Sequence, residues 1–187
     1  MPETTITTPG FIAVVSSEDH TSAAAVEVLC DTPNAAQSLP VINLASHAAK
    51  LLLHNPRVDI AAAGEHNLNT AETAHEVGQG IHFGRTIVLT NPSGRVAAYA
   101  PHSGNLAVLV SITGRCAETL AHELCLHVVT HVPPPLAVSR KDLPQGVSQE
   151  YALLDQRFVR DPSKTVAQVL YETECRVEQF IRLEAGR

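Results

Sequence analysis

Residues 95–113 of the chain, RVAAYAPHSGNLAVLVSIT, decide the fold. Two runs rich in apolar and β-branched residues, Arg95–Ala100 and Asn105–Thr113, flank the turn-forming sequence Pro101–His102–Ser103–Gly104. Runs of this kind on either side of a turn that contains Pro and Gly are typical of a β-hairpin. We therefore predict two antiparallel strands at this position.

A helix and a further strand follow the hairpin. Apolar residues recur on one helical stripe over Cys116–Thr130, and Pro133–Pro134–Pro135 ends that helix. A mixed connection over Arg140–Asp161 leads to a second helix, for which Ser163 is the expected N-cap. Alternation of apolar and polar residues predicts a closing strand at Val177–Leu183. The residues expected on one face of this strand are Val177, Gln179, Ile181 and Leu183.

The first half of the chain has the same order of elements. Phe11–Ser16 and Ser22–Cys30 predict a hairpin, Ser38–Asn55 a helix and Ile81–Thr90 a strand. The polar stretch between that helix and that strand has room for one more short helix. The residues expected on the apolar face of the Ser38–Asn55 helix are Ile42, Ala45, Ala49, Leu52 and Leu53.

The repeat predicts an α+β protein of two tandem subdomains, each a three-stranded antiparallel sheet with helices on one face. We place the subdomains at residues 10–92 and 93–187, after a disordered tail at residues 1–9 that is rich in Thr and Pro. Such a sheet can bury its apolar side against its helices, so we expect no further layer.

Composition limits the possible functions. Of 187 residues, 44% are hydrophobic and 17% charged, and the formal net charge is −6, which excludes wholesale disorder and argues against nucleic acid as a partner. No apolar run approaches the roughly 20 residues that span a bilayer, and Met1–Gly10 lacks a signal-peptide pattern. We therefore expect a soluble cytoplasmic protein that does not act at a membrane. The cysteines, expected to be free and buried because no C-x-x-C pair occurs, are Cys30, Cys116, Cys125 and Cys175.

Histidines on the Cys116–Thr130 helix raise the alternative of a metal-dependent enzyme. His122 is followed by Glu123, as in a zinc-protease helix, but the next histidine is His127, which faces another side of the helix. His127 and His131 have i,i+4 spacing but no evident third ligand nearby. Sequence motifs for covalent catalysis and for phosphate binding are also absent. We therefore expect no metal, no cofactor and no enzymatic activity.

The end of the chain carries the most specific resemblance to a known family. Pro162–Val166 begins a helix and Phe180–Gly186 closes the chain in a pattern that closely resembles the C-terminal end of translation elongation factor Ts. Other segments that are similar to motifs of that family are Val77–Gly78, Tyr99 with His102, and Leu124–Val129. Together these segments cover most of residues 75–187 in the order in which the family has them.

The resemblance implies a fold and a function. Members of the family consist of two homologous α+β subdomains and promote release of GDP from the GTPase elongation factor Tu, which is therefore the implied partner. The positions that the resemblance marks as partner-binding are Asp31, Thr32, Pro33, Asn34, Val77, Gly78 and His102. Structural interpretations stay open beside it: Pro33–Asn34 as a plain turn after a strand, Val77–Gly78 as a strand entry that needs a small residue, and His102 as a turn histidine.

The chain also departs from the family pattern. In the family an Asp-Phe pair enters the GTPase beside its nucleotide site, whereas this chain has Pro33 and Asn34, which supply neither a carboxylate nor an aromatic wedge. A coiled-coil insertion expected between Tyr151 and Pro162 and an N-terminal helical domain have no counterpart in the sequence. The alternative is therefore a paralogous interaction module that has kept the fold but lost nucleotide exchange. We expect docking to survive better than exchange.

Overall fold

The computed structural model describes residues 8–66 and 68–187. Most of the expected disordered tail, residues 1–7, therefore lies outside the described residues. At the end of that segment the carbonyl of Pro9 accepts a hydrogen bond from the backbone N–H of Cys30 at 2.8 Å, so this part is joined to the strand that ends at Cys30. Among the described residues, no helix is both long and apolar enough to cross a bilayer.

The first sheet is antiparallel, with the strand order β1-β2-β3. Its strands are β1 (Gly10–Ser16), β2 (Ser22–Cys30) and β3 (Ile81–Thr90). Helices connect β2 to β3: α1 (Pro33–Ala36), α2 (Leu39–His54), α3 (Ile60–His66) and α4 (Thr70–Val77). The buried face of α2 differs in part from the expected stripe, because Ile42 and Leu53 are only half-buried. The residues that α2 buries are Val41, Leu44, Ala45, Ala48, Ala49 and Leu52.

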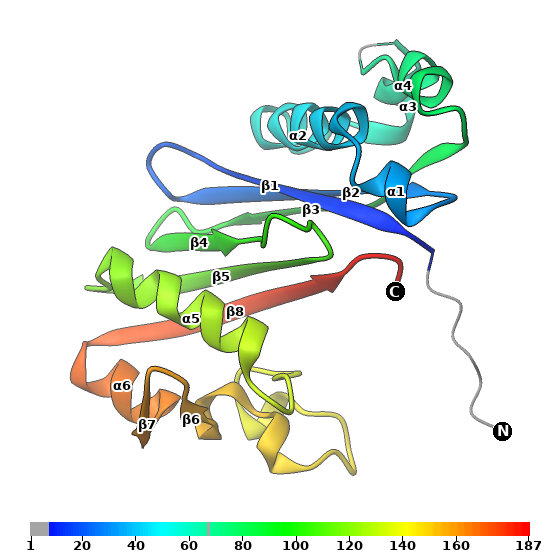
Figure 1. Cartoon of the computed structure of the whole chain (residues 1–187). Helices are drawn as coiled ribbons and strands as arrows, with labels where there is room; N and C mark the ends of the chain where they lie inside the picture. The colour runs from blue at the N-terminus through cyan, green and yellow to red at the C-terminus, as the bar shows by residue number, and fades with distance from the viewer. Residues whose placement is uncertain (1–7, 67) are drawn as a thin grey trace, which may run out of the picture.

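The second sheet is also antiparallel, with the strand order β4-β5-β8, so the last strand pairs with the predicted hairpin. Its strands are β4 (Arg95–Tyr99), β5 (Leu106–Gly114) and β8 (Cys175–Glu184), and its helices are α5 (Glu118–Thr130) and α6 (Val166–Glu172). The predicted α+β fold with two three-stranded antiparallel sheets is confirmed (Figure 1). Between α5 and α6 lie three 3-10 turns, Arg140–Asp142, Gln149–Tyr151 and Leu153–Asp155, and the short hairpin of β6 (Arg157–Phe158) and β7 (Asp161–Thr165).

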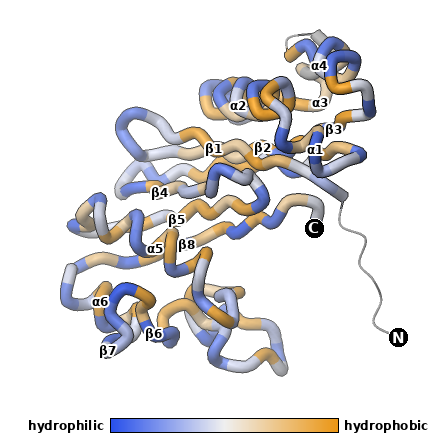
Figure 2. Tube along the Cα trace, in the orientation of Figure 1, coloured by the Kyte–Doolittle hydropathy of each residue, from blue (hydrophilic) through white to orange (hydrophobic). Residues whose placement is uncertain are grey.

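The two sheets pack face to face, with helices on the outer side of each (Figure 1). The expectation that each sheet buries one face only is therefore wrong. Strands β2 and β5 consist almost entirely of small and medium apolar residues, so both of their faces can be buried, and these strands are correspondingly hydrophobic in Figure 2. The buried residues of the shared core are Ile12, Ala23, Ala25, Leu89, Val96, Ala107, Leu109 and Leu183. Because the halves share this core, their division at residues 10–92 and 93–187 stays a prediction.

The predicted alternation of the last strand is wrong because β8 contains a bulge. Ser111 of β5 pairs with Gln179, but the next residue, Ile112, pairs with Val177, so Glu178 is an extra residue in β8. A bulge of this kind reverses the face on which the following side chains lie. Val177 and Phe180 consequently pack in the core beneath α5 and α6. Ile181 and Leu183 pack between the two sheets instead.

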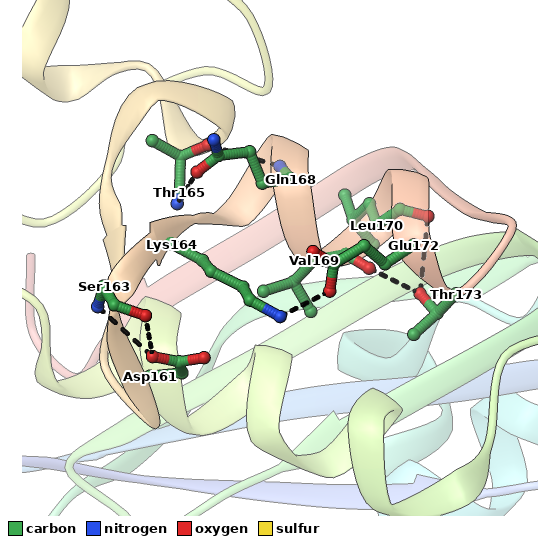
Figure 3. A network of polar contacts seen from close by, with 9 residues as sticks. All are labelled: Asp161, Ser163, Lys164, Thr165, Gln168, Val169, Leu170, Glu172 and Thr173. Atoms are coloured by element: carbon green, nitrogen blue, oxygen red, sulfur yellow. Dashed lines mark hydrogen bonds and ion pairs between the residues drawn. The ribbon is translucent and has the colours of Figure 1, made fainter.

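The start of α6 also differs from the expectation, because Thr165 rather than Ser163 caps the helix. The Thr165 hydroxyl accepts a hydrogen bond from the backbone N–H of Gln168 at 3.2 Å, and the Gln168 side chain accepts one from the N–H of Thr165 at 2.8 Å (Figure 3). This reciprocal pair is a capping box. Ser163 belongs to β7, where its hydroxyl donates to the carboxylate of Asp161. A hairpin as short as β6–β7 leaves little trace in sequence periodicity.

Candidate partner-binding surface

The first of the predicted contact segments, Asp31–Asn34, leaves β2 and begins α1. All of its residues are exposed. The Thr32 side chain accepts a hydrogen bond from the N–H of Ala35 at 3.3 Å, and Pro33 occupies the first turn of α1, where its fixed φ angle is compatible with a helix. The segment is thus a capped helix start rather than a plain turn.

The second predicted segment, Val77–Gly78, ends α4. Gly78 has a φ of 69°, in the left-handed region, and its N–H donates to the carbonyl of His75. A Cβ atom at Gly78 would meet nothing within 4 Å, so the backbone conformation rather than lack of space favours glycine. Val77–Gly78 is therefore a helix C-terminus, and β3 begins only at Ile81.

Three hydrogen bonds join the first segment to Gln79 and Gly80, the two residues that follow the second segment. The N–H of Thr32 donates to the side-chain oxygen of Gln79 at 2.9 Å, and the Gln79 amide nitrogen donates to the Thr32 hydroxyl at 3.1 Å. Next to this pair, the N–H of Gly80 donates to the carboxylate of Asp31 at 3.1 Å. Segments that are far apart in the chain are therefore held side by side.

The third predicted position, His102, is exposed in the turn between β4 and β5. The turn packs against β1: the carbonyl of Gly104 accepts a hydrogen bond from Ile12 at 2.7 Å, and a Cβ atom at Gly104 would lie 2.2 Å from the ring of Phe11. On its other side, the side-chain amide of Gln37 donates to the carbonyl of Ser103 at 2.6 Å. The turn that carries His102 is thus connected to the segment that follows α1.

The structure therefore brings all the predicted contact positions to one edge of the molecule. We call residues 31–37, 77–80 and 101–105 the composite surface; it lies where α1 and the β4–β5 turn meet in Figure 1. Asp31 is its only Asp, Glu, Lys or Arg. Beside it is a hollow of about 300 Å³, lined by Thr8, Pro9, Gly10, Pro33, Ala36, Gln37, Asn105 and Ala185. Such a surface offers amide hydrogen bonds and apolar contact.

Sequence reasoning missed three residues of this region. Gln37 and Gln79 make the hydrogen bonds that assemble the composite surface. Leu39, in the first turn of α2, is 73% exposed although it is a large apolar residue. Its place outside the apolar stripe of α2 is the one signal in the sequence that could have identified it. The two glutamines leave no such signal, because their partners are distant in the chain.

The C-terminal end of β8 is fixed beneath the composite surface by a buried carboxylate. Glu27 of β2 forms an ion pair with Arg85 at 2.9 Å and accepts a hydrogen bond from the N–H of Gly186 at 2.8 Å. Burial alone would raise the pKa of Glu27, but the hydrogen bonds from Arg85 and Gly186 and the charge of Arg85 outweigh it and lower that pKa. A Cβ atom at Gly84 would lie 2.5 Å from the Glu27 carboxylate, so glycine leaves the space that this carboxylate occupies.

The histidines of α5 form no metal site in the part of the chain that the structure describes, where no group of three or more His, Cys, Asp or Glu residues is placed to hold an ion. His127 is fully buried; it accepts a hydrogen bond from the N–H of Val159 at 3.2 Å, so its other ring nitrogen donates to Gln156 at 3.0 Å. Burial lowers the pKa of His127 to about 4. The ring of His122 instead packs edge-on against Tyr99.

The cysteines are free thiols, as expected, and all except the half-buried Cys116 are buried. Burial raises the pKa of Cys30 to about 11 and the pKa values of Cys116 and Cys125 to about 12. Thiols with such pKa values are almost entirely protonated at neutral pH and are weak nucleophiles. Their environment is that of packing residues.

These features define a class of protein: a two-sheet α+β module whose candidate site is a contact surface assembled from three segments of the chain. The family model described as Elongation factor TS matches residues 36–150 and 145–187. The elongation factor Ts of Thioalkalivibrio sulfidiphilus is 26% identical over 97% of this chain and 74% of that protein, and that of Alkalilimnicola ehrlichii is 27% identical over the same shares. The elongation factor Ts of Hydrogenovibrio crunogenus is 26% identical over 95% of this chain and 72% of that protein. The chain belongs to the elongation factor Ts family.

Proposed function

We propose that this protein binds elongation factor Tu and promotes release of GDP in translation elongation, acting in the cytoplasm. One observation carries the proposal. Asp31–Asn34, Val77–Gly78 and His102, which the family resemblance marks, lie in or next to segments that hydrogen bonds join, and all of them except the half-buried Val77 are exposed. If these positions had unrelated structural roles, nothing would require their segments to lie next to one another.

The surface is suited to binding a folded protein. Its segments are connected by hydrogen bonds within the free chain, so little conformational entropy remains to be lost when a partner binds. Exchange requires more than binding, because the factor must bind the nucleotide-free GTPase more tightly than the GDP-bound form. Any residue that promotes GDP release must therefore act at the place where the two forms of the partner differ.

A specific observation favours a second candidate, the paralogous interaction module that docks without exchange. Pro33 lies within the first turn of α1 and Asn34 is exposed beside it. At these positions the chain presents neither a carboxylate that could disturb a magnesium and phosphate site nor an aromatic ring that could separate packed helices. Docking through the rest of the composite surface is compatible with weak exchange.

The two candidates are separated by measuring binding and GDP release with the same cognate elongation factor Tu. Calorimetry gives the affinity, and fluorescence of labelled GDP gives the release rate. Binding with accelerated release supports the exchange factor, and binding without acceleration supports the docking module. Absence of binding would overturn both. Asn34→Arg should weaken binding, whereas Gln145→Arg, which adds the same charge at an exposed position outside the composite surface, should not.

A further inference from the structure

We propose that Gln37 and Gln79 are positioning residues that fix the two ends of α1, and that they thereby set the arrangement of the composite surface. The inference rests on the proposed function for its consequence in binding. Its structural part concerns the free chain alone, so it can be tested even if elongation factor Tu is not the partner.

The need for positioning follows from the length of α1. Only Pro33–Ala36 are helical, and a single hydrogen-bonded turn is marginal in water unless other contacts hold it. Ala35 and Ala36 are buried and anchor its inner side. Pro33 and Asn34 are exposed on its outer side, where a partner could contact them. Their placement therefore depends on the contacts at the two ends of the helix.

Gln79 fixes the N-terminal end. Both polar groups of its side chain are used, because its oxygen accepts from the N–H of Thr32 and its nitrogen donates to the Thr32 hydroxyl. The same hydroxyl accepts from the N–H of Ala35, so the helix cap and the connection to residues 77–80 meet at one atom. Loss of the Gln79 side chain would leave the cap without this support.

Gln37 fixes the C-terminal end across the boundary between the two sheets. It follows α1, and its amide nitrogen donates to the carbonyl of Ser103. Within the described chain this is the only hydrogen bond between residues 31–38 and residues 101–105. It therefore links the turn that carries His102 directly to the segment after α1, in addition to the Ile12–Gly104 bond that holds the same turn to β1.

The chemistry of the Gln37 contact predicts which substitutions are tolerated. A carbonyl oxygen can only accept a hydrogen bond, so residue 37 must donate. Gln37→Glu keeps the size of the side chain but places a second acceptor opposite the carbonyl. Gln37→Ala removes the contact, and Gln37→Lys restores a donor of similar reach. Gln145→Glu, at an exposed position in the connection between α5 and α6, adds the same charge as Gln37→Glu and serves as its control.

The first measurement is amide hydrogen exchange of the free protein. In Gln37→Glu and Gln37→Ala, amide hydrogen exchange within residues 101–105 should become faster. In Gln37→Lys and Gln145→Glu, it should be as slow as in the unchanged protein. In Gln79→Ala, acceleration should appear instead at residues 31–36. The Tm should change little in every variant, because both side chains are at the surface. Unchanged exchange in Gln37→Glu, or acceleration over the whole chain, would overturn the positioning role.

The second measurement is the affinity for cognate elongation factor Tu. We expect Gln37→Glu and Gln37→Ala to bind about tenfold more weakly, because the turn that carries His102 would be less well ordered before binding. Gln37→Lys should recover most of that loss, and Gln145→Glu should show none. If the unchanged protein binds but Gln37→Glu binds equally well, the inference is wrong and the proposed function stands. If the unchanged protein does not bind, the proposed function fails. The amide hydrogen-exchange data then still decide whether Gln37 positions the turn.

Discussion

The composite surface and the region around α6 differ in the kind of polar contact that joins their segments. At the composite surface, segments from both sheets are joined by uncharged amide groups, Gln37 to Ser103 and Gln79 to Thr32. Around α6 and the β6–β7 hairpin the surface contacts are ion pairs instead, such as Lys164 with Glu172 at 2.6 Å (Figure 3). Of the two segments that most closely resemble the family, Pro162–Val166 lies at this charged end, whereas Phe180–Gly186 runs to the hollow beside the composite surface. The difference shows that a segment by which a family is recognised can lie away from the surface that we propose as the partner-binding site.

Removing the carboxylate that fixes the C-terminal end beneath the composite surface should have the largest effect. Glu27 is 2% exposed and paired with Arg85, so Glu27→Gln leaves a guanidinium without its counter-charge. We expect a loss of about 2–4 kcal/mol in the free energy of unfolding. Urea denaturation measures it, with Glu118→Gln, at an exposed position, as the control. A loss as small as that of the control would show that the pair does not stabilise the fold.

Lowering the pH should reduce the free energy of unfolding through His127, which is buried in α5. Its pKa in the folded state is about 4, below the ordinary value of 6.5, so stability is full above pH 6.5 and is lost as the pH falls toward 4. The unfolded chain takes up the proton over this range and the folded chain does not. The expected loss in the free energy of unfolding is about 3 kcal/mol.

Denaturation at several pH values tests this dependence. His127→Gln should be less stable at neutral pH but should lose less on acidification, because it cannot titrate. Asn43→Gln, at an exposed position on α2 that does not titrate, should keep the pH dependence of the unchanged protein. An equal slope in all three proteins would mean that other groups dominate the acid response.

The neutral character of the composite surface predicts a weak effect of salt on binding. Exposed charges are screened over about 10 Å at 0.1 M salt, and the composite surface contributes only Asp31. Raising the salt concentration from 50 to 200 mM should therefore change the affinity for elongation factor Tu by no more than about threefold. A much steeper dependence would indicate that the partner instead binds the charged end around α6.

The smallest effect is expected at the charged end itself. Lys164 and Glu172 are both more than one third exposed, and ion pairs of this kind contribute less than about 1 kcal/mol. Glu172→Gln should therefore change the free energy of unfolding by less than about 1 kcal/mol and leave binding to elongation factor Tu unaltered. Calorimetry and urea denaturation of this one variant test both statements. A clear loss of affinity would assign part of the partner surface to this end.

Much of the fold could be predicted because its signals are local. Turn residues between alternating runs gave both hairpins, and helical periodicity gave α2 and α5. The packing of one sheet on the other could not be predicted in this way, since an Ala-rich strand such as β2 fits equally well in a sheet with one buried face. The bulge at Glu178 depends on pairing with β5, which the local pattern does not identify. The cap at Thr165, in contrast, has a local signature in Gln168 three residues later, which the choice of Ser163 overlooked.

The candidate site was predictable only in part. The resemblance named its positions, but no pattern in the sequence showed that residues 31–34, 77–78 and 102 meet. The contact from Gln37 to Ser103 spans 66 positions in the chain, and a side-chain bond to a backbone carbonyl requires no particular residue at the accepting position. The role of Gln37 was therefore not predictable from the sequence.

The central claim is that this chain docks on elongation factor Tu while exchanging its nucleotide weakly, because Pro33 and Asn34 replace an acidic and an aromatic residue. Stopped-flow release of labelled GDP from cognate elongation factor Tu tests it most directly. The unchanged protein should accelerate release much less than a full-length family member, and the double substitution Pro33→Asp with Asn34→Phe should raise the rate without greatly tightening binding. If the unchanged protein already matches the full-length factor, the account of this segment is wrong, and another part of the surface acts on the nucleotide.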